Sequence, residues 1–580
     1  MATPSTLERL TTSTAGVHAS SLARQTAFLA FCLPWLLLLA WLASVAWFLC
    51  DDAFISFRYA RNLLDGHGLV FNPGERVEGY SNFLWVLELA LIWALVGLRP
   101  EHAAPWLSVA CTVGTVAAML WWIARIPGVR HRRVVAWIAL GLVCSSATFA
   151  VWTSAGGLET RQFTFFVVLA IVCLTVHGSR CWGLILVSLS LAAASYTRPE
   201  GPLIAACCFA WFIGQRILTS KRLRLEPTEV FSLIAPFVVL VLAHVLFRHA
   251  YYGEWLPNTY YAKHVRPWYE SGFRYLWAAA LETGLYFLWP LALLALRETW
   301  RERRDLCYAL PLLCIGLHAA YLFRIGGDHF EYRPLDFYWP LLAVPAATSI
   351  VGLGSAISTN LSRVHWNLPA WTRPRPSVCA VALFVPALVY SSALQGAILF
   401  GVTVERSRTL LALPAMPILV AISNDLRSRM GPQYVALRLA DHRFFANGRL
   451  QLWRDYDRMQ RGVIPTDALT ASGTIGIPFY YLPDLRVVDT AGLTDATVAR
   501  HPVERPNEER VIAHDRSPPP GYLQERGVNF QVHPPATSAV QALSRAQYTV
   551  LVGLDLWMPF DSEDHDWVVE RFGTRNLLQR

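Results

Sequence analysis

The sequence predicts a polytopic α-helical membrane protein with about 11–12 membrane spans and a C-terminal α/β domain outside the membrane. Of its 580 residues, 54% are hydrophobic and only 16% are charged, whereas soluble domains are roughly 45–50% apolar and 25% charged. Residues 27–50 contain no charged side chain, and this run is long enough to cross a bilayer core of roughly 30 Å. The net charge of +9 comes largely from short loops between apolar runs, which indicates membrane orientation and excludes nucleic acid as the expected partner.

Further apolar runs are predicted to span the membrane. They are residues 103–123, 134–152, 163–176, 182–196, 202–217, 230–246, 276–296, 306–323, 337–353 and 378–400. Basic loops at residues 125–133, 180, 216–224, 297–304 and 363–375 are cytoplasmic by the positive-inside rule. Residues 83–98 do not fit this alternation, because a complete span there would place the loop around Arg132 outside. We therefore expect this segment to be re-entrant or half of a broken pair, with the N-terminus inside and the C-terminus outside.

The chain divides into three predicted regions. Residues 1–26 form a cytoplasmic tail, residues 27–403 form the transmembrane domain, and residues 404–580 form a soluble extracytoplasmic domain in which long apolar runs stop. In the last region, short strands are predicted at residues 468–472, 486–488 and 548–552, and helical patterns at residues 434–440 and 540–546. These elements together predict a small α/β domain.

Two adjacent carboxylates, Asp51 and Asp52, stand where the first apolar run ends. After them, Ile55, Tyr59 and Leu63 recur every four residues, which predicts an amphipathic helix on the membrane surface with both carboxylates facing water. One acid alone is explained as a cap of that helix. A second acid adds like-charge repulsion, which is tolerated mainly where a cation or a reacting proton uses it. The pair is therefore a candidate catalytic site and a candidate site for a divalent cation such as Mg²⁺.

Carboxylates, cations and aromatic rings recur together in five loops on the predicted outer side. With the helix after Asp52, these loops supply candidate substrate-binding residues, which are Arg58, Glu75, Glu78, Asn82, Glu159, Glu200, Asn258, Tyr260, Asp328 and His329. Cations neutralise phosphate, carboxylates take a proton from a hydroxyl or bind a metal ion, and aromatic rings stack on sugars. One such loop is explained by interfacial anchoring. Five on one side favour a reaction between a lipid-linked phosphate and a hydroxylated acceptor at the membrane face.

Several of these segments resemble the outer loops of the GT-C superfamily of integral-membrane glycosyltransferases. They read DDAFISFRYARNLLDGHGLVFNPGERVEGYSNFLW, SAGGLE, TRPEG, YYGEWLPNTYYAK and GGDHFEYRP. They are similar in particular to the mycobacterial-type terminal β-(1→2)-arabinofuranosyltransferase group and its bacterial relatives. The resemblance covers residues 27–400 and extends weakly to GTIGIPFYYLPDLRVVDTAGLTD in the C-terminal domain.

This resemblance implies an enzyme of the bacterial cytoplasmic (inner) membrane with a polyprenyl-phosphate sugar as donor. The sugar, arabinofuranose or another pentose, would pass to an extracytoplasmic glycan or glycoprotein. GT-C enzymes place an acidic residue of the first outer loop at the reaction centre, which corresponds to Asp51 or Asp52. The basic residues that hold the lipid phosphate correspond in position to Arg198, Lys263 and Arg333.

Two other classes of function remain open at this point. A flippase or transporter of lipid-linked glycans would need polar residues near the midplane of its spans, whereas the predicted spans carry almost no charge. A non-catalytic membrane protein of glycan assembly would be favoured if the C-terminal domain alone bound glycan and the carboxylates were dispensable.

Overall fold

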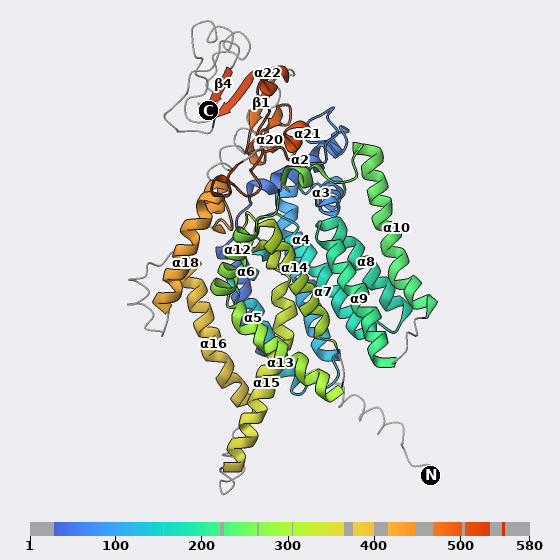
Figure 1. The fold of residues 1–580 in the computed structure, drawn as a ribbon, viewed down its shortest axis with the longest axis vertical. Coiled ribbons are helices and arrows are strands. Elements are labelled where there is room, and N and C mark those ends of the chain that lie inside the picture. Colours follow the sequence, from blue (N-terminus) through green and yellow to red (C-terminus); the bar gives the residue numbers. More distant parts are fainter. Residues whose placement is uncertain are drawn as a thin grey trace, which may run out of the picture.

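The chain forms an elongated helical bundle with the C-terminal strands and short helices at one end (Figure 1). The computed structural model describes residues 28, 30–154, 156–220, 226–263, 266–303, 306–364, 375–399, 416–439, 441–447, 450, 468–501, 505–533 and 548–551. The predicted tail at residues 1–26, the predicted boundary at residue 404 and the helical pattern at residues 540–546 lie outside these residues.

Six helices of the described chain are long and apolar enough to cross a membrane. They are α4 (Pro100–Arg125), α7 (Thr160–His177), α9 (Gly201–Ser220), α10 (Pro227–Tyr252), α15 (Tyr338–Val364) and α16 (Pro376–Leu399). Two bent pairs raise this number to eight, namely α5 (Arg132–Cys144) with α6 (Ala147–Ser154), and α12 (Tyr269–Thr283) with α13 (Leu285–Arg303). Shorter apolar helices are Ala30–Val45, α3 (Phe83–Val96), α8 (Cys181–Thr197) and α14 (Ala309–Ile325). Every predicted span coincides with one of these helices or pairs, so the polytopic helical fold is confirmed.

Two spans that the sequence predicts as continuous are sharply bent. The pair α5 and α6 bends by 74° at Ser145 and Ser146, and the pair α12 and α13 bends by 85° at Gly284. Gly284 has a φ of +75°, a left-handed conformation that glycine adopts without strain and that ends α12. Both sides of each break are apolar, so hydropathy alone did not reveal the bends.

Helix α3 is too short to cross a membrane by itself. Its 14 residues extend roughly 21 Å at 1.5 Å per residue, against a hydrocarbon core of roughly 30 Å. Gly97, with a φ of +72°, ends the helix and turns the chain into α4. This length agrees with the expectation that residues 83–98 do not form a complete span, whether re-entrant or half of a broken pair.

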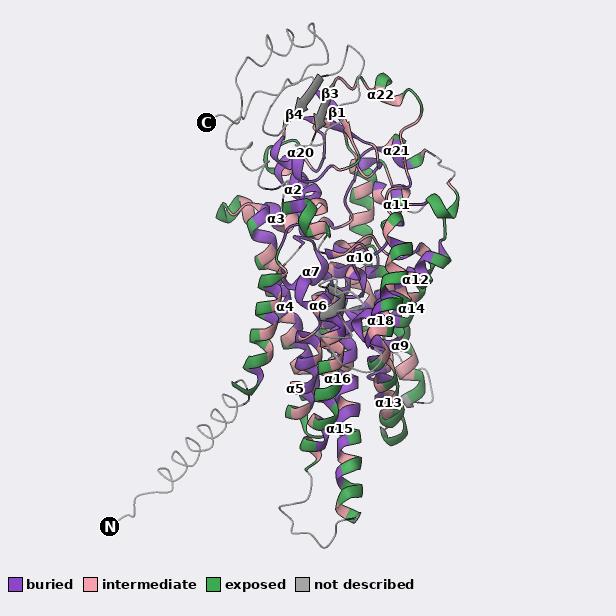
Figure 2. Ribbon diagram, turned by 90° about the vertical axis from the view of Figure 1, so that its left-hand side faces the viewer, coloured by how far each residue is buried: buried purple, intermediate pink, exposed green. Residues whose placement is uncertain are grey.

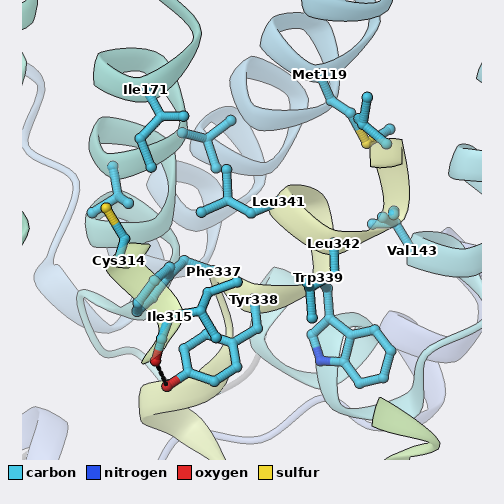
Figure 3. Close-up of a cluster of buried hydrophobic side chains, with 14 of the residues drawn as sticks. Met119, Val143, Ile171, Cys314, Ile315, Phe337, Tyr338, Trp339, Leu341 and Leu342 are labelled. Carbon is cyan, nitrogen blue, oxygen red and sulfur yellow. Dashed lines mark hydrogen bonds between the residues drawn. The ribbon is translucent and has the colours of Figure 1, made fainter. Parts of the chain in front are cut away.

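The buried core of the bundle centres on the first half of α15. Figure 3 shows Phe337, Tyr338, Leu341 and Leu342 among apolar side chains of neighbouring helices, with the Tyr338 hydroxyl donating to the Ile315 carbonyl at 3.3 Å. The outer helices are green on their outer faces in Figure 2. Helix α10 is an example, because several of its large apolar side chains, such as Phe231, Val239 and Leu242, are exposed. Such a helix fits contact with lipid, since water would disfavour so much apolar surface.

Helix α2 (Asp51–Leu64) is covered by protein, and the prediction of a surface helix is wrong. Ten of its 14 residues are buried, and it packs against α3, α4 and the short helix α20 (Ile477–Tyr481). Arg58 and Arg61 on its polar face donate to backbone carbonyls of residues 479–485. The C-terminal chain therefore supplies the hydrogen bonds that water was expected to supply.

The C-terminal part of the described chain begins with α18 (Met416–Met430), which packs against α12 and α16. Two parallel strand pairs follow, β1 (Leu469–Ser472) with β2 (Arg486–Asp489), and β3 (Phe530–His533) with β4 (Tyr548–Leu551). The short helices are α20, α21 (Ala496–Arg500) and α22 (Tyr522–Glu525), and α11 (Asn258–Lys263) lies against α21. The single-turn 3₁₀ helices are η1 (Arg333–Leu335), η3 (Gly431–Gln433) and η4 (Asn507–Glu509). Three of the predicted strands coincide with β1, β2 and β4.

The helix predicted at residues 434–440 does not form over residues 434–438. The backbone amides of Ala436 and Leu437 instead donate to the carbonyls of Asp328 and His329, at 2.8 and 2.9 Å. Ala436 also has a φ of +49°, which interrupts helical geometry. This pairing draws the C-terminal chain onto the loop that follows α14.

Candidate active site

The start of α2 is held firmly by the loop that precedes α7. The amide of Cys50 donates to the Gly156 carbonyl at 3.1 Å, and the amide of Gly156 donates to the Phe48 carbonyl at 2.8 Å. Gly157 has a φ of +71°, and a Cβ there would lie 3.0–3.2 Å from side chains of Leu49 and α2. The two carboxylates that follow Cys50 are therefore fixed in position.

The carboxylate of Asp51 is part of a contact with the C-terminal chain. Its Oδ2 and Oδ1 accept hydrogen bonds from the backbone amides of Gly476 and Ile477, at 3.0 and 2.9 Å. A Cβ at Gly476 would overlap the carbonyl of Asp51, so glycine is needed for this close approach. Asp51 is thus a cap, as one of the two acids was expected to be, but it caps α20 and not its own helix.

Asp52 has a different environment from Asp51. It is half-buried, and its carboxylate forms no hydrogen bond or ion pair with any described residue. Burial raises its pKa, but the nearby charges of Lys263, His329, Arg333 and His514 outweigh burial and hold the pKa below its ordinary value. Asp52 is therefore an ionised carboxylate. Because no described residue occupies its two oxygens, both can contact a ligand.

Two cations accompany Asp52. Lys263, at the end of α11, is exposed and forms no ion pair with the rest of the described chain. The Arg333 guanidinium is 3.3 Å from Asp328 through Nε and lies over the Phe330 ring at 4.7 Å, and it makes no hydrogen bond with a described residue. Both side chains thus retain donors for an anionic ligand.

Three imidazoles also gather around Asp52. His329 lies in the loop after α14, whereas His442 and His514 come from the C-terminal part of the chain. The ring of His329 is centred 4.9 Å from that of His442 and 5.3 Å from that of His514. Sequence reasoning missed His442 and His514, since neither lies in a motif and both reach the site only through the chain pairing at Asp328.

Unlike Lys263 and Arg333, Arg198 has every guanidinium nitrogen in contact with a carboxylate. It is buried and pairs with Glu200 through two hydrogen bonds at 2.7 and 3.2 Å, and with Glu159 at 3.2 Å. Asn82 donates to the other oxygen of Glu159 at 2.9 Å. Burial lowers the pKa of Arg198, but Glu200 and Glu159 outweigh it and raise the pKa above its ordinary value. Two carboxylates already neutralise this guanidinium, so we reassign Arg198 from phosphate binding to the internal scaffold.

Arg58, another predicted substrate-binding residue, connects helix α2 to the loop after it and to the C-terminal chain. Arg58 is fully buried and donates to the carbonyls of Phe71, Phe479 and Leu485, at 2.8, 2.5 and 2.9 Å. Burial, with the charge of Arg61, lowers the pKa of Arg58 to about 9. A side chain so enclosed has no face for a substrate, and its role is structural.

The remaining predicted residues of the outer loops form contacts of the same kind. Glu75 pairs with Arg526 at 2.5 Å, and Glu78 pairs with Arg248 at 2.5 Å. Asn258 is buried and donates to the carbonyls of Gly492 and Leu493, at 2.8 and 3.0 Å. Tyr260, in contrast, is exposed on α11, three residues before Lys263. Of these predicted residues, only Tyr260 presents an exposed side chain near the cations.

The two acids predicted to bind a divalent cation differ in their contacts. Both carboxylate oxygens of Asp51 accept hydrogen bonds from backbone amides, whereas no described residue forms a hydrogen bond with the carboxylate of Asp52. Among the described residues, no group of three or more His, Cys, Asp and Glu side chains is arranged to hold a metal ion.

A second charged network braces the loop that carries His329. Arg427 of α18 contacts Glu282 at 2.6 Å and Glu331 at 2.7 Å, and Arg438 contacts Glu331 at 2.8 Å. These residues join α12, the loop after α14 and the chain after α18 into one unit. No sequence pattern predicted this network, because its members are far apart along the chain.

Comparisons with known proteins agree with this arrangement of helices and outer loops. No protein-family model matches the sequence. In an alignment of 357 residues that covers 54% of the chain, it is 26% identical to a terminal beta-(1->2)-arabinofuranosyltransferase of Corynebacterium glutamicum. In an alignment of 231 residues that covers 37% of the chain, it is 28% identical to a protein of the same name from Mycobacterium tuberculosis. These matches span 49% and 35% of the two relatives, so the chain covers half of their length or less.

A solved structure extends the likeness to most of the chain. The crystal structure of ArnT from Cupriavidus metallidurans, bound to undecaprenyl phosphate, matches with a TM-score of 0.50 and 13% sequence identity. The match covers 83% of this chain and 88% of ArnT. At this identity the likeness shows the fold alone. The chain therefore shares the helical membrane fold of ArnT, in line with the fold that its outer loops led us to expect, and its sequence is similar to terminal beta-(1->2)-arabinofuranosyltransferases.

Proposed function

We propose that this protein is a membrane glycosyltransferase that moves a sugar from a polyprenyl-phosphate donor to a hydroxyl group of an extracytoplasmic glycan or glycoprotein. The observation that carries the proposal is the ionised, unpaired Asp52 carboxylate beside the cations Lys263 and Arg333. The likeness to arabinofuranosyltransferases favours arabinofuranose or another pentose as the sugar. The ArnT structure holds undecaprenyl phosphate, which supports a lipid phosphate as the leaving group.

Asp52 acts on the acceptor in this reaction. The acceptor oxygen attacks the anomeric carbon and forms the new C–O bond, while the bond from that carbon to the phosphate oxygen breaks. The electron pair of the broken bond remains on the lipid phosphate. The acceptor proton passes to the Asp52 carboxylate, which can take it because it is ionised and no described residue forms a hydrogen bond with it.

Lys263 and Arg333 act on the donor. The donor phosphodiester carries one negative charge, and the departing lipid phosphate gains a second. Two cations with available N–H donors stabilise this developing charge through charge-assisted hydrogen bonds. Asp328, paired with Arg333 at 3.3 Å, orients the guanidinium without neutralising both of its edges.

Purified protein in lipid nanodiscs tests the proposal. We expect transfer of radiolabelled sugar from polyprenyl-phosphate arabinofuranose to an arabinan acceptor. The Lys263→Gln and Arg333→Gln variants should each weaken donor binding by about 1.5–3 kcal/mol, the value of a hydrogen bond to a charged group. Arg297, exposed at the other end of the bundle on α13, provides the matched control Arg297→Gln, which should bind donor normally. Unchanged donor affinity in both site variants would refute the phosphate assignment, and absence of transfer from any lipid-linked sugar would favour a transporter or a non-catalytic role.

The proposed location is the bacterial inner membrane with the C-terminal domain outside the cytoplasm. All eleven cysteines are free and only Cys181 is exposed, so a Cys181→Ser background is nearly silent to an impermeant thiol reagent. Exposed positions Asp65 and Glu525 should react from outside intact cells when changed to cysteine. Exposed positions Arg133 and Arg301 should not. The reverse pattern would place the site in the cytoplasm and favour a nucleotide-linked donor.

A further inference from the structure

The three imidazoles beside Asp52 have a hydrogen-bonding pattern that the reaction proposed above does not use. Nδ1 of His329 is 3.1 Å from the carbonyl oxygen of Tyr434, and Nδ1 of His514 is 3.1 Å from that of Ile512. Because a carbonyl only accepts hydrogen bonds, both Nδ1 atoms carry the hydrogen. In the neutral rings, Nε2 therefore keeps its lone pair.

The Nε2 atoms of these rings have no hydrogen-bond partner among the described residues. The ring of His442 makes no hydrogen bond with a described residue, and its Nε2 atom is buried. A buried polar atom without a partner is costly unless a ligand satisfies it. The cluster thus offers hydrogen-bond acceptors next to the reacting carboxylate.

Two of the three rings, His329 and His442, have lowered pKa values. Burial, together with the neighbouring His442 and His514, lowers the pKa of His329 to about 3, although Asp52 and Asp328 oppose the shift. Burial also lowers the pKa of His442. A neutral imidazole contributes little to binding a phosphate, for which Lys263 and Arg333 are the proposed ligands. Its unprotonated nitrogen can, however, accept a hydrogen bond from a hydroxyl group.

Aromatic rings adjoin these acceptors. Phe330 stacks on His442 with centroids 4.4 Å apart. The exposed ring of Tyr434 lies 5.7 Å from His514 and 6.1 Å from His329. Apolar rings combined with a few fixed polar atoms are typical of sites for small hydroxylated ligands.

We propose that His329, His442 and His514 form the subsite for the hydroxyl-bearing sugar acceptor, whose hydroxyl groups donate to the free Nε2 atoms. The inference rests on the proposed glycosyltransferase function and deepens it. It assigns acceptor recognition to side chains of the C-terminal chain, which reach Asp52 through the backbone pairing of Ala436 and Leu437 with the loop after α14.

The experiment compares acceptor and donor binding in full-length protein in nanodiscs. His442→Phe and His514→Phe keep a ring but remove the nitrogen acceptors, and each should raise the Kd of a fluorescent arabinofuranose oligosaccharide and the acceptor KM about 3- to 10-fold, as expected for one hydrogen bond. Donor affinity should not change, because the proposed phosphate ligands are Lys263 and Arg333. His514→Gln, whose amide oxygen can accept in place of Nε2, should recover part of the loss. The control is His249→Phe, since His249 stacks on Trp255 at 3.9 Å on α10, away from the cluster.

The outcomes separate this inference from the proposed function. Unchanged oligosaccharide Kd and acceptor KM in both variants, or no binding by the wild-type protein, would overturn the inference. A selective loss of donor affinity would also overturn it, because the cluster would then belong to the phosphate site. If the wild-type protein binds the oligosaccharide through these histidines but transfers no sugar, the glycosyltransferase proposal fails while the subsite stands.

Discussion

The two adjacent acids at the start of α2 should respond in opposite ways to the same isosteric change. In Asp51→Asn, one of the two oxygens that accept the amides of Gly476 and Ile477 at 3.0 and 2.9 Å becomes an NH₂ group. That group cannot accept, so one backbone amide loses a charged partner at a cost of about 1.5–3 kcal/mol. In Asp52→Asn no internal hydrogen bond is lost, but the reacting base is removed, which lowers kcat by about 10²–10⁴-fold.

Thermal unfolding in detergent and turnover in nanodiscs measure the two effects on the same preparations. We expect a lower Tm for Asp51→Asn with residual turnover, and an unchanged Tm for Asp52→Asn with turnover nearly abolished. Gly476→Ala serves as a second probe of the contact, because its Cβ would overlap the Asp51 carbonyl, and it should resemble Asp51→Asn. The reasoning is refuted if Asp51→Asn keeps the wild-type Tm while losing as much activity as Asp52→Asn.

Three further changes probe the interior. Asp336→Asn leaves the buried guanidinium of Arg161, now 3.0 Å from Asp336, without its countercharge, and should cost about 3–5 kcal/mol of stability in unfolding assays; a wild-type Tm would contradict this. Arg198→Gln leaves the buried carboxylates of Glu159 and Glu200 without their countercharge. We therefore expect poor folding, seen as loss of monodisperse protein on size-exclusion chromatography, and not a selective loss of donor affinity. Burial raises the pKa of Asp489 from 3.8 to about 6. The folded state therefore binds the proton more tightly, and stability should fall by about 2 kcal/mol as pH rises from 4 to 6. Asp489→Asn should flatten that part of the stability profile, and an identical pH dependence in both proteins would exclude this carboxyl as its source.

The sequence alone determined the membrane-spanning character and the positions of the helices. An apolar run must be satisfied within lipid by its own backbone hydrogen bonds, so hydropathy and length report local structure directly. Short strands such as β1 and β2 were also predictable, because their alternation and flanking turns are local signals. Residues 83–98 were recognised as an incomplete span from charge placement, and the short α3 agrees with that expectation.

The tertiary structure alone decided which polar side chain does what. Asp51 and Asp52 are adjacent and chemically identical, yet backbone amides 425 residues away engage one of them and leave the other to the cations. Arg198 and Arg333 both looked like phosphate ligands, but two buried carboxylates neutralise Arg198. His442 and His514 had no visible link to the first loop. Ionisation, pairing and access depend on neighbours in space, and those neighbours come from chain segments whose separation in sequence carries no information about their contact.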